Sequence, residues 1–294
     1  MSFLSGFVAI VGSPNVGKST LLNRILETKL AIVSPKPQTT RNRIIGVFHG
    51  KGYQIVFMDT PGIHKTRTAL HRSMVESALS TFHEVDIVLL MIEIGTGHDP
   101  DTLSIIGKLK GVKKTCILVI NKIDLSPKAQ LLPLIDRFSG LYPFAEIIPI
   151  SALTGEGVDI LLEKLKQRLR PGPQFFPDDI ETDLPETFLV SEIIREKIYL
   201  NMRQEVPYSS AVTVERMEEI PEQNLLTISA RIHVETESQK GMLIGKGGRM
   251  IRTIGRSARL DLEKMFAVRV FLDLVVRVEK NWSKDAKALR RLGY

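Results

Sequence analysis

The sequence predicts an α/β domain with a doubly wound, mostly parallel sheet, followed by a smaller α+β domain. Three observations indicate this order. Apolar runs rich in β-branched residues alternate with helix-periodic segments through the first half, as in parallel βαβ units. The proline-bearing stretch Arg170–Pro177 then interrupts both patterns, because proline sustains neither a helix interior nor a central strand. Beyond it the elements read α-β-β-α-α-β, which does not continue the first pattern.

The first half supplies the elements of the larger domain. We predict strands at Phe7–Val11, Ile44–His49, Gln54–Met58, Ile87–Glu93, Thr115–Ile120 and Glu146–Ile150. We predict helices at Lys18–Leu26, Arg72–Phe82, Asp101–Lys110, Lys128–Phe138 and Val158–Leu169. In a sheet of this kind the ligand-binding loops follow the carboxyl ends of the strands.

The second half begins with a predicted helix at Phe188–Arg203. Strands are expected at Ala211–Met217, Leu225–Val234 and Ala267–Val278, and a glycine-rich turn between two short helices precedes the last strand. We therefore divide the chain into a first domain at 1–172, a linker at 173–186, a second domain at 187–280 and a basic tail at 281–294. Within the tail we expect a solvated amphipathic helix at Ser283–Leu292.

Composition narrows the classes of function. The longest apolar run, Ile87–Ile92, is far shorter than the roughly 18 residues that a membrane-spanning helix needs, and we expect no targeting segment. The single cysteine, Cys116, lies in an apolar run, so we expect a buried thiol in a reducing cytoplasm.

The net charge is +7, and Lys240–Arg259 holds six basic residues and no acidic one. This concentration of positive charge invites a polyanionic partner.

A glycine-rich loop follows the first predicted strand and opens the first helix. Its residues are Gly12, Ser13, Pro14, Asn15, Val16, Gly17, Lys18 and Ser19, with Thr20 next. A phosphate loop requires this setting, because successive backbone N–H groups then point at phosphate oxygens at the positive end of a helix. We expect Lys18 to reach the β and γ phosphates of a nucleotide, and Ser19 to bind magnesium through its hydroxyl.

A second motif, Asp59-Thr60-Pro61-Gly62, ends the third predicted strand. The Asp59 carboxylate can hold a magnesium-bound water there, and the Gly62 N–H can face the γ-phosphate. The next residue is Ile63, where Ras-like enzymes carry a water-positioning glutamine, so we expect slow intrinsic hydrolysis. Asn15 has two interpretations: it holds a monovalent cation, potassium, against the transition state, or it only shapes the phosphate loop.

Two more motifs point to guanine. Asn121-Lys122-Ile123-Asp124 ends the fifth strand, and Asp124 can accept hydrogen bonds from both N1–H and the exocyclic amine of guanine. Adenine offers no such pair of donors, so it would leave a buried carboxylate unpaired. Ser151-Ala152-Leu153 follows the sixth strand, where backbone N–H groups could reach the guanine carbonyl oxygen. Four motifs in this order predict a guanine-nucleotide site.

A polar segment, Ser34–Arg43, separates the first helix from the second strand. Either Thr39 or Thr40 can complete magnesium coordination when a γ-phosphate is present, and we favour Thr40. The segment would then become ordered with GTP and loosen after hydrolysis, a known form of switch. The predicted catalytic residues are thus Lys18, Thr40 and Gly62, with Asn15 if it holds potassium.

A second site is predicted around the turn Gly245-Lys246-Gly247-Gly248. Such a turn lets the backbone approach a sugar-phosphate chain, as in KH domains, which clamp about four nucleotides of single-stranded RNA. The expected RNA-binding residues are Lys240, Gly245, Lys246, Gly247, Gly248, Arg249, Arg252 and Arg256. The alternative is a helix hairpin with a solvated basic face.

Taken together, these motifs resemble those of Era-type GTPases, bacterial Ras-like GTPases with a C-terminal KH domain, over essentially the whole chain. The matching segments are Gly12–Ser19, Gln38–Arg41, Asp59–Gly62, Asn121–Asp124, Ser151–Leu153 and Ile244–Gly248. The resemblance implies a P-loop GTPase domain, then a type II KH domain, with GTP or GDP and Mg²⁺ bound. It also implies binding near the 3′ end of 16S ribosomal RNA during small-subunit assembly, and peripheral association with the inner face of the cell membrane.

The leading hypothesis is therefore a GTP-driven switch that changes how an RNA groove is presented. Two alternatives stay open. In one, the chain is an RNA-binding protein in which nucleotide merely stabilises the fold. In the other, it is a membrane-recruited regulator that uses the basic tail to contact anionic lipid. We expect a monomer.

Overall fold

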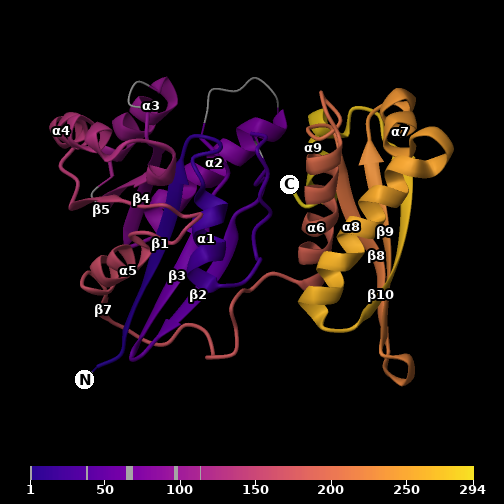
Figure 1. Ribbon diagram of the computed structural model, residues 1–294, viewed down its shortest axis with the longest axis horizontal. Helices are drawn as coiled ribbons and strands as arrows, with labels where there is room; N and C mark the ends of the chain where they lie inside the picture. The colour runs from indigo at the N-terminus through magenta and orange to yellow at the C-terminus, as the bar shows by residue number, and fades with distance from the viewer. Residues whose placement is uncertain (1, 38, 64–68, 96–98, 113) are drawn as a thin grey trace. The chain divides into compact units, whose positions relative to one another are not determined.

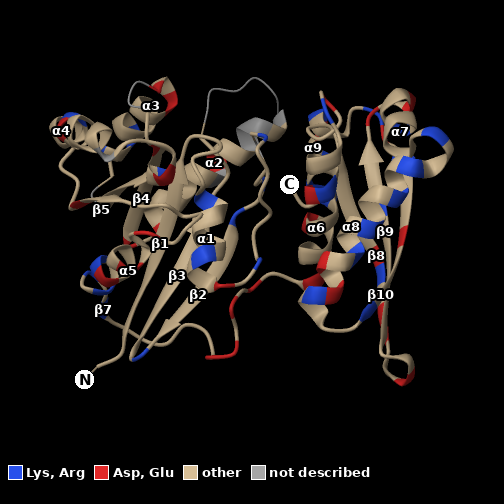
Figure 2. Ribbon diagram, viewed as in Figure 1, with Lys and Arg blue, Asp and Glu red and all other residues tan. Residues whose placement is uncertain are grey.

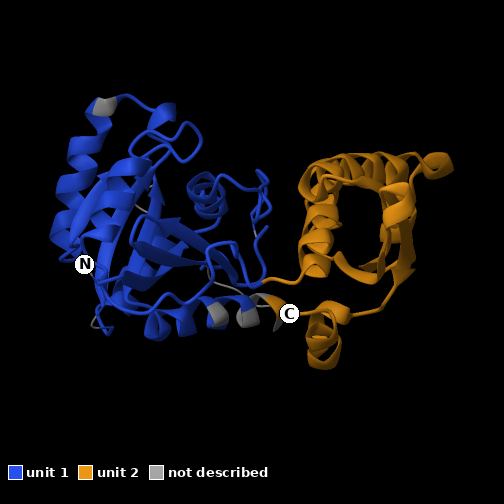
Figure 3. Ribbon diagram, turned by 90° about the horizontal axis from the view of Figure 1, so that it is seen from below, with its two compact units in different colours: residues 1–67, 71–183 blue, residues 68–70, 184–294 orange. Residues whose placement is uncertain are grey.

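The computed structural model describes residues 2–37, 39–63, 69–95, 99–112 and 114–294. The chain folds into two compact units (Figure 3). The first comprises residues 1–67 and 71–183, and the second comprises residues 184–294 with the short piece 68–70. Each unit is built around its own sheet and its own apolar core.

The first unit contains a sheet in the order β2-β3-β1-β4-β5-β6 (Figure 1). Its strands are β1 (Leu4–Gly12), β2 (Ile44–Gly50), β3 (Tyr53–Asp59), β4 (Ile87–Glu93), β5 (Thr115–Asn121) and β6 (Glu146–Pro149). All neighbours pair in parallel except β2 and β3, which form an antiparallel pair. The predicted doubly wound, mostly parallel sheet is thus confirmed.

The five main helices of this unit are α1 (Lys18–Leu26), α2 (Ala69–Glu84), α3 (Pro100–Leu109), α4 (Leu131–Leu141) and α5 (Val158–Lys166). Only α1 has the predicted bounds: α2 is longer than predicted at both ends, α3 is shifted by one residue, and α4 and α5 differ for local reasons. Lys128–Gln130 forms a separate 3₁₀ turn, so α4 begins later than expected. At the end of α5 the N–H groups of Arg168 and Leu169 bond only three residues back, which closes the helix early. The next two residues form the short strand β7 (Arg170–Pro171), which pairs with β1. The sequence predicted no strand at Arg170–Pro171.

Residues 175–182 run along the first sheet, and we call them the linker strap. The Gln54 side chain is fully buried, and its amide accepts from Phe175 N (2.9 Å) and Phe176 N (3.1 Å) and donates to Phe176 O (2.8 Å). Further along, Val47 N donates to Glu181 O at 2.8 Å. Because β2 is an edge strand, the strap covers backbone groups that would otherwise face water.

The second unit has the predicted order α-β-β-α-α-β. Its elements are α6 (Glu186–Asn201), β8 (Ala211–Ile220), β9 (Leu225–Val234), α7 (Glu237–Ile244), α8 (Arg249–Phe266) and β10 (Arg269–Val278). The sheet order is β10-β9-β8, with β9 parallel to β10 and antiparallel to β8. Apolar residues of α6, α8 and the strands form the core. The expectation of two short helices around the glycine turn was wrong for α8, which has 18 residues.

The C-terminal tail is packed, so the expectation of a solvated helix was wrong. Trp282 is fully buried, its ring stacks on Tyr294 with centroids 5.8 Å apart, and its Nε1 donates to Ser209 O at 3.1 Å. In the short helix α9 (Ala286–Arg291) and just after it, Leu289 and Leu292 are buried as well. The basic residues of α9, which are Lys287, Arg290 and Arg291, are exposed. Among the residues that the structure describes, no helix has the length and apolar character to cross a membrane.

Candidate functional site

The loop between β1 and α1 is compact and tightly packed. Gly17 has φ +99°, and a β-carbon there would lie 2.2 Å from Asn121 Nδ2, so only glycine fits. Lys18 is buried, and its Nζ donates to Gly12 O at 3.2 Å and to Ser13 O at 2.9 Å. Burial lowers the pKa of Lys18 to about 8, although the Asp59 carboxylate acts in the opposite direction. The backbone therefore holds the Lys18 amine inside the loop.

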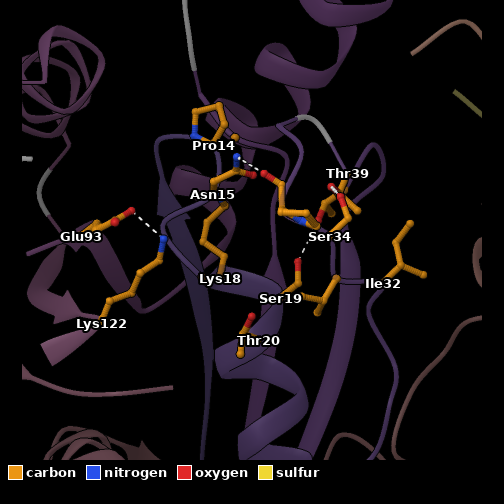
Figure 4. Close-up of a pocket in the computed structure, with 15 residues that line it drawn as sticks. Pro14, Asn15, Lys18, Ser19, Thr20, Ile32, Ser34, Thr39, Glu93 and Lys122 are labelled. Atoms are coloured by element: carbon orange, nitrogen blue, oxygen red, sulfur yellow. Dashed lines mark hydrogen bonds and ion pairs between the residues drawn. The ribbon is translucent and has the colours of Figure 1, made fainter. Parts of the chain in front are cut away.

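A cavity of about 510 Å³ opens above this loop (Figure 4). It gathers side chains that are distant in sequence, because the strands carrying their loops end at the same edge of the sheet. The predicted site residues that line it are Pro14, Asn15, Gly17, Lys18, Ser19, Thr20, Thr40, Gly62 and Lys122. It is large enough for a small ligand.

Three oxygen-bearing side chains meet beside this cavity, and two of them, Ser19 and Thr40, line it. Ser19 Oγ lies 2.8 Å from Thr40 Oγ1 and donates to Asp59 Oδ2 at 2.6 Å. Asp59 is fully buried, and its Oδ1 has no hydrogen-bond partner among the described residues. Burial raises the pKa of Asp59 to about 6, although Lys18 and the Ser19 hydroxyl act against this. A buried carboxylate beside two hydroxyls fits a hard cation such as Mg²⁺, which takes oxygen ligands.

The two adjacent threonines differ in their surroundings. Thr39 Oγ1 lies 2.8 Å from Ser34 Oγ and donates to Lys36 O at 2.8 Å, so it bonds within its own segment. Thr40 is the one whose hydroxyl meets Ser19. This geometry favours Thr40 over Thr39. The neighbouring Gln38 lies outside the described residues.

The Asp59–Gly62 loop lies against the phosphate loop. Thr60 Oγ1 donates to Ile10 O at 2.8 Å, and Ile63 N donates to Gly12 O at 3.2 Å. A β-carbon at Gly62 would lie 2.9 Å from the backbone of Pro14, so the two loops touch directly at that point. Ile63 is buried in the apolar core, which leaves no polar side chain there.

The two guanine motifs are joined by side chains. Asn121 Nδ2 donates to Val16 O at 2.8 Å, and its Oδ1 accepts from Ala152 N at 2.9 Å. Ser151 Oγ donates to Asp124 Oδ1 at 2.6 Å. Asn121 thus cross-links the phosphate loop to the loop at Ala152, a role that its place in the motif did not reveal. Leu153 is largely exposed beside them.

Sequence reasoning missed two partners of these motifs. Glu93, at the end of β4, holds the Lys122 amine at 2.6 Å. Asp99 caps α3, and its Oδ2 accepts hydrogen bonds from Ser13 Oγ and Thr102 Oγ1. Burial by itself would raise the pKa of Asp99, but these hydrogen-bond donors hold it below its usual range. The only signal in the sequence was an aspartate before Pro100, typical of a helix start.

The glycine turn of the second unit connects α7 to α8. Gly245, Gly247 and Gly248 have φ between 60° and 75°, a region that glycine adopts without strain. Arg252, one turn into α8, donates to Gly247 O and, at 3.2 Å, to Gly248 O. The turn is therefore fixed to the helix that follows it.

A groove of about 380 Å³ lies between α8 and β10. Figure 2 shows basic positions in blue along α8. Its α8 wall includes Arg252, Arg256 and Arg259, and its β10 wall includes Phe271 and Leu272. Phe271 is 60% exposed, so an aromatic face borders the basic helix. Sequence reasoning named the basic wall and missed the β10 wall. Three predicted RNA-binding residues, Lys240, Lys246 and Arg249, do not line this groove. The Lys240 amine, on α7, lies 3.9 Å from the Glu237 carboxylate.

Comparison with known proteins accounts for both halves. A family model described as a 50S ribosome-binding GTPase matches residues 7–122, and a KH domain model matches residues 205–283. The chain is 56% identical to GTPase Era of Syntrophus aciditrophicus over 99% of its own length and 95% of the relative's. It is 52% identical to GTPase Era of Geobacter metallireducens, covering 99% of this chain and 98% of the relative.

Two solved structures resemble the whole chain. One is a variant of Aquifex aeolicus Era bound to GDP and AlF₄⁻, with a TM-score of 0.96, 42% identity and coverage of 100% of this chain and 99% of that one. The other is Era in complex with MgGDPNP and nucleotides 1506–1542 of 16S ribosomal RNA, with the same TM-score and identity and 99% coverage of each chain. Since close relatives match it from end to end in sequence and fold, the chain belongs to the Era family of GTPases.

Proposed function

We propose that this protein is a GTP-hydrolysing switch whose second domain binds single-stranded RNA near the 3′ end of 16S ribosomal RNA and assists assembly of the small ribosomal subunit. The observation that carries the first part is the meeting of Ser19, Thr40 and Asp59 beside the buried amine of Lys18. The second part is supported by the basic groove and by the relative that is bound to 16S nucleotides.

The phosphate end of the site would work through fixed donors. The backbone N–H groups from Asn15 to Lys18 and the hydroxyl of Thr20 would face the phosphates, with the positive end of α1 behind them. The Lys18 amine would exchange its two carbonyl partners for β and γ oxygens. Ser19 and Thr40 would hold magnesium directly, and Asp59 would hold it through water. The ion, when bound, offsets the charge that develops on the phosphates.

The base end would select guanine. Asp124 is already oriented by Ser151, and it would accept from N1–H and the exocyclic amine. In the loop from Ser151 to Leu153, the Leu153 N–H would donate to the carbonyl oxygen, because the N–H groups of Ser151 and Ala152 bond to Glu156 O and Asn121 Oδ1. Both contacts are lost with adenine, and the unpaired groups make that loss costly.

Hydrolysis would be slow without an additional group. Ile63 is buried and apolar, so it positions no water. The Gly62 N–H and the Lys18 amine remain to stabilise charge on the γ-phosphate. Asn15 stands at φ 63° and donates to Pro35 O at 3.1 Å, which brings it to the segment that carries Thr40. Its role as a potassium ligand is a prediction.

RNA would enter the groove between α8 and β10. The glycine turn would approach the sugar-phosphate backbone, and Arg252, Arg256 and Arg259 would supply positive charge along it. Phe271 offers a face on which an unpaired base can stack, and stacking tolerates any base. Lys240, Lys246 and Arg249 would contact phosphates at the turn.

The linker strap offers a route by which nucleotide state could reach the second domain. It is bonded to β2 through Val47 and to β3 through Gln54. The segment that carries Thr40 leads into β2, and β3 ends at Asp59. The two loops that would contact magnesium and the γ-phosphate therefore adjoin the strands that hold the strap. A change at the γ-phosphate would then alter the chain between the domains.

The test compares RNA affinity in the two nucleotide states. Full-length protein is titrated with an RNA matching the 3′ end of 16S ribosomal RNA, first with GDPNP and Mg²⁺ and then with GDP and Mg²⁺. We expect different affinities, and a Gln54→Leu variant should reduce the difference while still binding both ligands. Gln167→Leu, an exposed substitution directly after α5, is the matched control. Equal affinities in the parent chain would contradict the switch and leave two independent modules.

Peripheral membrane association remains a prediction about the basic residues of the tail. The one tryptophan there faces the core and not the surface, so little apolar area is left to insert into lipid. Co-sedimentation with anionic vesicles, compared with a chain shortened after Val278, tests it. The monomeric state is a further prediction, for light scattering.

A further inference from the structure

The last turn of α1 carries a side chain that contacts the loop predicted to read guanine. Arg24 Nε donates to Ala152 O at 3.3 Å, and its Nη2 donates to Leu153 O. A β-carbon at Gly155 would lie 3.9 Å from Arg24 Cδ and Nε, so the loop turns closely over this side chain. One planar guanidinium thus holds two consecutive carbonyl groups, a task for which arginine is well shaped.

The same loop is held on its other side by a different element. Ala152 N donates to Asn121 Oδ1 at 2.9 Å, and Ala152 is 1% exposed. Both polar backbone groups of Ala152 are therefore bonded, one to β5 and the other to α1. The direction of the loop's remaining N–H groups depends on both attachments.

The attachment to α1 also relates the two ends of the nucleotide site. Lys18 and Ser19 stand in the first turn of this nine-residue helix and Arg24 in the last. Six residues of helix correspond to about 9 Å of rise, and a single helix keeps that distance constant. A second cavity, of about 490 Å³, is lined by Arg24, Ala152 and Leu153 and shares Thr20 with the phosphate cavity.

We infer that Arg24 is a positioning residue for guanine selection. It holds the carbonyl side of the loop so that the Leu153 N–H stays directed at the guanine carbonyl oxygen, while the N–H groups of Ser151 and Ala152 bond to Glu156 O and Asn121 Oδ1. The inference rests on the proposed function, because it assumes that guanine nucleotide occupies this site. It adds a determinant of specificity separate from Asp124, which reads the N1–H and the exocyclic amine.

The test measures the affinity of the full chain for GDP, IDP and ADP by calorimetry with Mg²⁺. The inosine base keeps the carbonyl oxygen and lacks the amine that Asp124 reads. We expect Arg24→Ala to weaken the binding of GDP and of IDP by the same factor, about threefold to tenfold, and to leave the affinity for ADP unchanged. The GDP-to-ADP ratio then falls while the GDP-to-IDP ratio stays constant.

Two further variants separate position from charge. Arg24→Lys keeps the charge without the planar fork, so we expect a smaller loss in the same pattern. Lys29→Ala removes an equal charge from the wall of the same cavity, and we expect parental affinities for all three nucleotides. Thermal unfolding of each variant shows that the fold is retained.

The outcomes are distinguishable. A parental GDP-to-ADP ratio in Arg24→Ala overturns the inference and leaves the proposed function standing. Equal losses for all three nucleotides also overturn it, because Arg24 would then support the fold and not base recognition. A parent chain that binds ADP as tightly as GDP contradicts the proposed function itself.

Discussion

The hydroxyl oxygens of Ser19 and Thr40 lie 2.8 Å apart, although the two residues belong to the first turn of a helix and to the loop that leads into an edge strand. Asp59 completes this group from the end of β3. Side chains of three separate segments thus meet at one point. A ligand that replaces these mutual hydrogen bonds would fix all three segments, and its departure would free them.

Removing the Thr40 hydroxyl tests this arrangement. We expect Thr40→Val to lower GTP turnover by about 10-fold to 100-fold, the range seen when a group around a metal site is lost, and to leave GDP affinity nearly unchanged. Thr39→Val is the matched control, because that hydroxyl bonds within its own segment. Single-turnover hydrolysis and GDP titration supply the two measurements. A larger effect at Thr39 would reverse the assignment.

The predicted potassium role of Asn15 can be tested without altering the fold. Asn15→Gly removes the amide, and glycine accepts the φ of 63° found there. If Asn15 holds the cation, the parent chain hydrolyses GTP faster in potassium than in sodium at equal ionic strength, and the variant shows no such difference. Identical rates for the parent chain in the two salts would remove the idea.

The basic wall of the groove gives a prediction about salt. Arg256→Gln should weaken RNA binding and reduce the slope of log affinity against log salt by about one, if this side chain neutralises one phosphate. Arg290→Gln, in α9 and outside the groove, should change neither quantity. Titrations at several salt concentrations decide between the groove and a general basic surface, which would make the two variants equal.

The packed tail predicts a stability effect. Trp282→Ala should lower the free energy of unfolding of the second unit by about 3 to 5 kcal/mol, because it empties a fully buried site and leaves Ser209 O without its donor. Urea unfolding followed by circular dichroism measures it. Lys284→Ala, at an exposed position of the same tail, should cost little, and a similar cost for both would place Trp282 outside the core.

His233 predicts how the stability of the second unit depends on pH. Burial and the positive charges of Arg231 and Arg291 lower the pKa of His233 to about 4, although the Glu215 carboxylate acts in the opposite direction. The two ring nitrogens of His233 lie within hydrogen-bond distance of Glu279 and Thr213. Between about pH 6.5 and 4 the unfolded chain binds a proton that the folded chain does not. Stability should therefore fall as pH drops through this window.

His233→Gln should flatten that part of the curve, and His83→Gln, an exposed histidine of α2, should not. Unfolding midpoints at pH 7 and pH 5 give the comparison. If the unfolding midpoint of His233→Gln changes with pH as steeply as that of the parent chain, the pH dependence belongs to other groups.

Much of the fold was readable from local patterns. The bounds of α1 and β4 were predicted to the residue, because each has a strong local signal: a loop-to-helix motif for α1 and a continuous apolar run for β4. The four strand-end motifs were readable for the same reason. Their convergence followed from the topology of a parallel sheet.

What escaped prediction depends on pairs far apart in the chain. Trp282 is buried because Ser209 and Tyr294 lie beside it, and the sequence around the tail shows only an amphipathic helix. Phe271 borders the groove because β10 lies opposite α8, which the basic stretch alone cannot reveal. Arg24 is one of many exposed basic residues until its distance to Ala152 is known.

The central claim is that the loops around Lys18 and Asp124 hold one magnesium-bound guanine nucleotide. Titration calorimetry of the purified chain with GDP and Mg²⁺ tests it most directly. We predict one site per chain, a strong preference for GDP over ADP, and loss of binding in Lys18→Ala, which removes the buried amine of the phosphate loop. The absence of heat with GDP, or undiminished binding in that variant, would contradict the account.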